Sequence, residues 1–248
     1  MSKKEEKNLP AVIDYSQEAG AGFQNLTVND TGIPYITILQ SLSPQVKKGE
    51  AHIEGAEEGD IFNTVTQEVI AGKDGIKVIP CAYEMKWTEW KSRESGGGFV
   101  SQHPSADVMV NCHKNSKGVD ELPNGNVIIP TAYYYVLIVK EDGTQEKAIL
   151  PMARTQLKKS RRWLSVMQAK KMTGTKGLYT PPMFSHTYHL TTIGEAKDKF
   201  SWFGWTIDEG KLIDSANLFA LVKQFNIEVS RGAVKSLPPV EASAEGNI

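Results

Sequence analysis

Basic side chains are concentrated in one segment of this chain, and their chemistry suits the binding of phosphates. Residues 147–194 contain nine lysines and arginines and no aspartate or glutamate. The whole chain has 28 basic and 29 acidic residues, so subtracting these nine bases leaves 19 against 29 acids. Within the segment, like charges at helical spacing destabilise a helix unless an outside anion relieves them. The closest neighbours are Lys158, Lys159, Arg161 and Arg162, which are expected to lie unpaired against one another. This segment is therefore expected to bind a polyanion.

Aromatic side chains are interleaved with these bases. They are Trp163, Tyr179, Phe184 and Tyr188. Cations neutralise phosphates and aromatic rings stack on unpaired bases, so the predicted ligand is single-stranded nucleic acid. The alternative is an ordinary solvated helix face without a binding role.

Two pairs of tryptophans add candidate stacking residues. Trp87 and Trp90 form one pair, and Trp202 and Trp205 form the other. Residues three apart on a strand point to opposite faces, so one member of each pair is expected to pack inward and the other to face a groove or solvent. The predicted nucleic-acid-binding residues are Arg154, Lys158, Lys159, Arg161, Arg162, Trp163, Lys170, Lys171, Lys176, Trp90 and Trp202.

Other chemistry has weaker support in the sequence. Cys81, His103, Cys112 and His113 are of the types that bind zinc, but no CxxC or HxxxH pair is present. The glycines at 96–98 lack the flanking residues of a phosphate loop, and no nucleophile or metalloprotease motif occurs. No catalytic residue, metal or cofactor is therefore predicted, and a non-enzyme is favoured.

The elements that must position these residues are mostly short β-rich runs separated by turns. Strands are expected at 33–40, 60–70, 75–83, 84–90, 107–112, 132–140, 147–151, 185–193 and 200–207. A helix is expected over 153–172, with its apolar stripe at Ala153, Leu157, Leu164 and Met167, Ser160 among them, and its bases outward. A second helix is expected from an Asp214 cap to about Gly232. This pattern predicts a mainly β fold with two helices, an elaborated OB-fold-like antiparallel barrel.

Composition and the positions of turn-forming residues suggest one domain with two appendages. Residues 1–32 are expected to form a flexible arm, 33–236 the OB-like nucleic-acid-binding domain, and 237–248 a flexible tail. No apolar run is long enough to span a membrane, and two cysteines do not make a disulfide framework. The protein is expected to be soluble, cytoplasmic and reduced.

Five stretches of the chain form a recognisable pattern: Ile33-Pro34-Tyr35-Ile36, the segment from Gly55 to Thr64, Gly96-Gly97-Gly98-Phe99, the basic run from Thr155 to Trp163, and the final helix. In this pattern the chain resembles a family of tailed-bacteriophage proteins over about residues 33–232. The resemblance implies an OB-fold, single-stranded DNA-binding protein of phage replication and recombination, located in the host cytoplasm. Such proteins often carry a strongly acidic C-terminal tail, whereas this chain has only Glu241 and Glu245 there.

The expected function is therefore sequence-tolerant binding of single-stranded DNA through a basic, aromatic-lined groove. Phage replication proteins and further copies of the chain are candidate partners. Two alternatives stay open. One is a virion structural or assembly protein whose basic helix contacts a neighbouring subunit. The other is a metal-dependent DNA-processing enzyme with scattered carboxylates.

Overall fold

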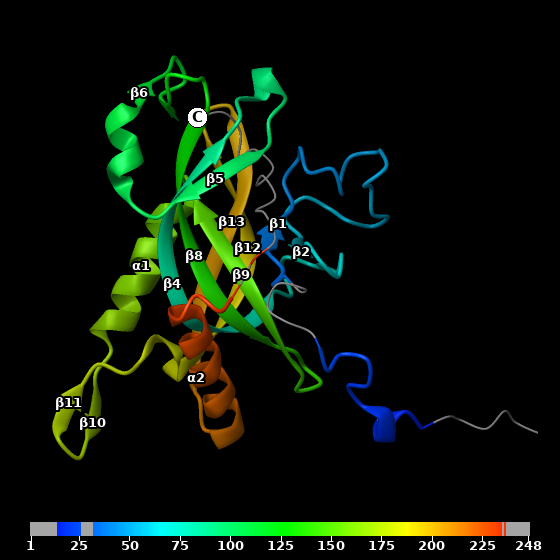
Figure 1. The fold of residues 1–248 in the computed structure, drawn as a ribbon, viewed down its shortest axis with the longest axis vertical. Coiled ribbons are helices and arrows are strands. Elements are labelled where there is room, and N and C mark those ends of the chain that lie inside the picture. Colours follow the sequence, from blue (N-terminus) through cyan, green and yellow to red (C-terminus); the bar gives the residue numbers. More distant parts are fainter. Residues whose placement is uncertain (1–13, 26–31, 235, 237–248) are drawn as a thin grey trace, which may run out of the picture.

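The computed structural model describes residues 14–25, 32–234 and 236 of the chain. Its body is a curled antiparallel sheet that forms a half-barrel, with one helix packed on each face (Figure 1). The predicted mainly β fold with two helices is confirmed, and the half-barrel is compatible with an OB-like fold. Residues 14–25 are exposed and include the 3-10 helix Ser16–Glu18. The rest of the predicted arm, at 1–13 and 26–31, and the predicted tail at 237–248 lie outside the described residues.

Eight strands form the main sheet, in the order β13-β12-β4-β8-β7-β6, with β5 paired to β4 and β9 paired to β8. The long strands are β4 (Ile76–Trp90), β8 (Val127–Val139), β9 (Gln145–Ala153), β12 (His186–Lys197) and β13 (Phe200–Leu212). The short strands are β5 (Phe99–His103), β6 (His113–Lys114) and β7 (Asp120–Glu121).

Two smaller sheets complete the β structure. The first contains β1 (Ile36–Ile38), β2 (Ile61–Asn63) and β3 (Val69–Ile70), and a parallel bridge from Tyr35 to Ile149 joins it to β9. The second is a hairpin of β10 (Met172–Gly174) and β11 (Gly177–Tyr179), which projects beyond the end of α1 (Figure 1).

Strand β4 explains much of the curvature. The sequence predicted two strands here, but they are one strand of 15 residues with a register shift between Pro80 and Ala82. Proline cannot donate to the ladder and a bulge sharpens the local twist. On one edge β4 pairs with β8 throughout, while on the other it pairs first with β12, at 76–78, and later with β5, at 87–90.

Helix α1 (Gln156–Ala169) packs on one face of the sheet. Its buried positions are Gln156, Ser160, Trp163 and Met167, which recur at helical spacing. The predicted stripe shares Ser160 and Met167 with this line but left out Gln156 and Trp163, so the real stripe includes two polar residues, Gln156 and Ser160. Both are satisfied: the Tyr134 hydroxyl lies 2.9 Å from Ser160 Oγ, and Gln156 Oε1 accepts from the Trp205 backbone N–H at 3.0 Å.

Helix α2 (Ala216–Ser230) covers the opposite face through Val222, Phe225 and Val229. Its N-cap is Ser215 rather than the predicted Asp214, because the Ser215 hydroxyl accepts from the Leu218 backbone N–H at 3.3 Å. The strand predicted at 107–112 is also wrong. That segment is the 3-10 helix Ala106–Asn111, whose first turn is capped by the Ser105 hydroxyl.

Candidate nucleic-acid interface

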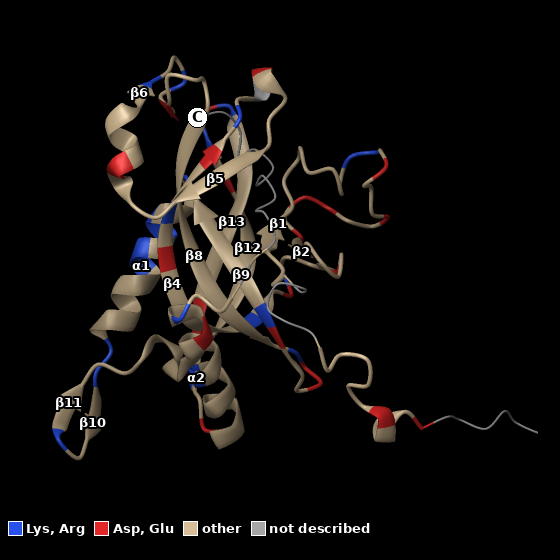
Figure 2. Ribbon diagram, in the orientation of Figure 1, with Lys and Arg blue, Asp and Glu red and all other residues tan. Residues whose placement is uncertain are grey.

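The basic residues in the first half of α1 point away from the core. Because Gln156, Ser160 and Trp163 face the sheet, the helical period places Lys158, Arg161 and Arg162 on the other side, and all three are exposed. We call these three residues the α1 basic face. None of them forms an ion pair with another described residue. In Figure 2 the blue segments of α1 gather in its N-terminal half.

Lys159 differs from its neighbours, although the sequence treated all four alike. The Lys159 ammonium pairs with Glu195 of β12, which lies 36 positions further along the chain and just outside the acid-free segment 147–194. Gly204 of β13 makes room for this contact, since a Cβ there would lie 2.7 Å from Lys159 Nζ and 2.5 Å from Gln156 Nε2. The expectation that the run is unpaired is therefore wrong at Lys159.

The end of α1 carries a second ion pair. Lys170 contacts Glu209 of β13 and lies 5.5 Å from the centre of the Tyr188 ring. His186 Nε2 is 3.9 Å from the same Glu209 carboxylate. Burial and the charge of Lys170 lower the pKa of His186, and Glu209 opposes that shift. Lys170 therefore stabilises the junction of α1 with β12 and β13, whatever else it contacts.

The other predicted bases are spread over different elements. Arg154 precedes the helix with a φ of +50° and is exposed. Lys171 donates to Thr180 Oγ1 at 2.6 Å, and Lys176 is exposed in the turn of the β10–β11 hairpin. With a rise of about 1.5 Å per residue, Lys158 and Lys170 are roughly 18 Å apart along the helix axis. The predicted site therefore divides into two groups, one at each end of α1.

The three tryptophans predicted as stacking residues are buried. Trp163 is 3% exposed, stacks on Tyr134 with ring centroids 4.6 Å apart, and meets the edge of Tyr188. Trp90 packs edge-on against Phe99, and Trp202 donates its indole N–H to Glu195 at 2.8 Å. At most 8% of the surface of each of these tryptophans is exposed, which does not suit the stacking role that the sequence suggested.

All five tryptophans lie in the described part of the chain. Four of them are buried, and Trp87 is half-buried. The β4–β8 register is regular from 82 to 90, so Trp87 shares a face with Tyr83. Tyr83 is also half-buried, and its ring meets that of Tyr134 edge-on at 5.2 Å. Burial raises the pKa of Tyr83, while the charge of Arg161 opposes this shift. We call Tyr83 and Trp87 the β4 aromatic face; it adjoins the α1 basic face through Arg161.

The sequence contained a signal for this arrangement. Trp87 was one of a tryptophan pair, and alternation predicted that one member would pack and the other would face outward. The structure shows Trp90 as the buried member. Trp90 packs against Phe99 of β5, a contact between two strands that no local pattern encodes.

Beside Trp87, the buried carboxylate of Glu89 holds three elements together. It accepts from Asn126 Nδ2 at 2.6 Å, from His103 Nε2 at 2.8 Å and from Ser101 Oγ at 3.1 Å. Burial raises the pKa of Glu89, but these hydrogen bonds outweigh burial and hold the pKa below its ordinary value. Ser101 and Glu89 meet the same ring nitrogen of His103, at 3.1 and 2.8 Å. A catalytic triad instead divides the nucleophile and the carboxylate between the two ring nitrogens.

The residues considered for zinc do not come together. Cys81 is fully buried under α2, and burial raises its thiol pKa to about 12. Cys112 follows the 3-10 helix Ala106–Asn111. Among the described residues, no group of three or more His, Cys, Asp or Glu side chains could hold a metal ion.

Fold and surface together define a class: a mainly β, half-barrel protein with a basic helix packed on the sheet and half-buried aromatics beside it. A family model described as Pam3 phage gp34-like protein matches residues 3–235. The chain thus belongs to the Pam3 phage gp34-like protein family, which confirms the phage origin expected from the sequence. No curated protein and no solved structure matches the chain. Neither α1 nor α2, nor any other helix in the described residues, has the length and apolar character needed to cross a membrane.

Proposed function

We propose that this phage protein binds single-stranded DNA without sequence preference and acts in phage DNA replication or recombination. The observation that carries the proposal is that Arg161 of the α1 basic face lies near enough to Tyr83 of the β4 aromatic face for its charge to oppose the rise in the tyrosine's pKa. Lys158, Arg161 and Arg162 supply cations without carboxylate partners among the described residues. Tyr83 and Trp87 supply ring surface along the neighbouring strand. Binding proteins for single strands combine a cationic track with aromatic stacking in this way.

Stacking on this surface differs from the stacking that the sequence suggested. Tyr83 and Trp87 are four residues apart on β4, or roughly 13 Å at the usual strand rise. Two bases of one strand could therefore stack on separate rings while the intervening phosphates face α1. Stacking on an exposed ring contributes about 1–3 kcal/mol per base.

The test is fluorescence anisotropy with a labelled oligo-dT strand and with the matching duplex, at low and moderate salt. The proposal predicts tighter binding of the strand than of the duplex at every salt concentration. Equal affinity for both, or no binding at low salt, contradicts it. Parallel incubation of unlabelled strand with Mg²⁺ or Mn²⁺ tests the DNA-processing alternative, for which cleavage is the expected result.

One observation favours an assembly protein as a second candidate. The β10–β11 hairpin projects from the body and exposes Leu178 and Tyr179, with 75% and 45% of their surfaces accessible. Projecting apolar side chains of this kind are common where subunits meet. Analytical ultracentrifugation over a range of protein concentrations, with Leu178→Ser as the comparison, would show whether the hairpin drives self-association.

A further inference from the structure

A pocket of about 390 Å³ opens where the small sheet meets the end of the half-barrel, and none of the residues of the proposed DNA surface lines it. Strands β1, β2 and β3 form one wall, and the beginning of β4, the end of β8 and His189 of β12 form the other. Its volume falls within the range of small-molecule sites, which are often found at the mouths of β-barrels.

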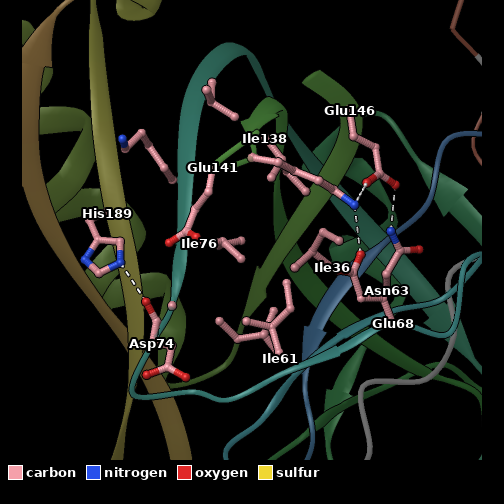
Figure 3. A pocket seen from close by; sticks show the side chains of 15 residues that line it. Ile36, Ile61, Asn63, Glu68, Asp74, Ile76, Ile138, Glu141, Glu146 and His189 are labelled. Carbon is pink, nitrogen blue, oxygen red and sulfur yellow. Dashed lines mark hydrogen bonds and ion pairs between the residues drawn. The ribbon is translucent and has the colours of Figure 1, made fainter. Parts of the chain in front are cut away.

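The floor of the pocket is aliphatic. Ile36, Ile61, Ile76 and Ile138 are buried members of the main core, and Ile70 packs against them from β3. Figure 3 shows these isoleucine side chains between the two polar sides of the pocket. The floor therefore offers an apolar chain a surface that is continuous with the core.

One polar side of the pocket is internally satisfied. Lys140 Nζ lies 3.0 Å from Glu68 and 3.5 Å from Glu146, and Glu146 also accepts from Asn63 Nδ2 at 2.7 Å. The hydrogen bond with Glu68 raises the pKa of Lys140, with burial opposing and Glu146 adding to the rise. This network leaves no free cation for an anionic ligand on that side.

The other side has carboxylates without basic partners. Asp74 and Glu141 border the pocket there, and neither forms an ion pair with a described residue. His189 Nε2 lies 2.9 Å from the Asp74 carbonyl oxygen, so this nitrogen carries the donated proton. Figure 3 places Asp74, Glu141 and His189 across the isoleucine floor from Glu68 and Glu146. Over the whole lining, four carboxylates face two lysines, Lys77 and Lys140.

We propose that this pocket binds an organic cation with an aliphatic body. The alkyl chain would lie on the isoleucine floor, and the ammonium or guanidinium group would meet Asp74 and Glu141. Charge complementarity selects against a carboxylate of the same length, because the lining carries four carboxylates against two lysines, and one of these, Lys140, is already paired.

The experiment is isothermal titration calorimetry of the full chain with butylammonium, hexylammonium, octylammonium and octanoate. Octylammonium should bind with one-to-one saturation, and octanoate should bind at least tenfold more weakly. Each added methylene should raise the affinity of the ammonium series by up to about fourfold. Equal binding of octylammonium and octanoate, or heat that never saturates, would overturn the proposal.

Two variants locate the site. Asp74→Asn with Glu141→Gln should weaken octylammonium about tenfold and remove the discrimination against octanoate. Ile70→Trp should fill the pocket and abolish binding of every probe. The matched control is Glu57→Gln with Glu58→Gln, which removes two exposed carboxylates from the loop before β2 and should leave binding unchanged. Unaltered octylammonium affinity in the Asp74/Glu141 variant refutes the site even if Ile70→Trp fails to fold.

Discussion

The side-chain amide of Gln40 binds the backbone of Phe203 as a neighbouring strand would. Gln40 Nε2 donates to the Phe203 carbonyl and Gln40 Oε1 accepts from the Phe203 N–H, both at 2.9 Å. Phe203 lies on the edge of β13 that has no strand partner among the described residues. On the same strand, Gln156 Oε1 accepts a hydrogen bond from the Trp205 backbone N–H. Two glutamines thus satisfy the open edge of the half-barrel and connect it to β1 and to α1.

Gln40→Ala should destabilise the fold by about 2–4 kcal/mol, because it leaves a backbone donor and acceptor of β13 without partners next to a buried position. Chemical denaturation measures this difference. Gln168→Ala is the control, since Gln168 is exposed on α1 and its loss should cost less than about 0.5 kcal/mol. Similar stabilities for the two variants would show that water satisfies the β13 edge equally well.

Trp87 should report on DNA binding, and Trp163 should not. In the free protein, Trp87→Phe should remove most of the tryptophan emission that acrylamide can quench, because the other four indoles are buried. Adding oligo-dT should quench the wild type and Trp163→Phe, but scarcely change Trp87→Phe. The affinity of Trp87→Ala should fall by about 1–3 kcal/mol. Quenching that persists without Trp87 would place the bases elsewhere.

Glu195 is expected to limit the cationic surface, because it holds Lys159. Glu195→Gln should raise affinity for oligo-dT about two- to fivefold and steepen the slope of log affinity against log salt by about 0.7, which corresponds to one more neutralised phosphate. Glu68→Gln makes the same charge change beside Lys140 and is the control. If both variants gain affinity equally, the effect is one of net charge and not of a released lysine.

Glu89 should make stability depend on acid. Its pKa in the folded protein is below the ordinary value of 4.5, so folding favours the carboxylate. The stabilisation is complete above pH 4.5 and is lost as the pH falls through the lower folded value. Glu89→Gln should therefore reduce the free energy of unfolding at pH 7 and narrow the difference from wild type toward pH 3. Urea denaturation at several pH values measures the free energy of unfolding of the variant and of the wild type. A difference between the two that stays constant with pH would contradict the role of the charge.

The sequence predicted most of the fold because its elements are locally encoded. Alternation and Asn-Gly or Asp-Gly turns located the long strands, and helical spacing located both helices. The same local logic put the α1 basic face outward. It failed at 107–112, where a serine cap produces a 3-10 turn in a segment rich in β-branched residues.

The remainder depended on contacts between distant residues. The segment at 147–194 is acid-free in sequence but not in space, since Glu195 and Glu209 reach Lys159 and Lys170 from β12 and β13. The predicted stripe of α1 included Ser160 but left out Gln156 and Trp163, although Gln156 and Ser160 are both buried. Their hydrogen bonds to Trp205 and Tyr134 are what permit that burial.

The most direct test of the central claim is the salt dependence of oligo-dT binding by a charge-reversal variant. Lys158→Glu, Arg161→Glu and Arg162→Glu together should abolish binding at moderate salt and, where binding is measurable at low salt, reduce the slope by about 2. Thermal unfolding should change little, because these side chains are exposed. Lys47→Glu, Lys48→Glu and Lys73→Glu make the same change in net charge on exposed loops and should keep most of the wild-type affinity. Wild-type affinity and slope in the α1 variant would contradict the proposed interface.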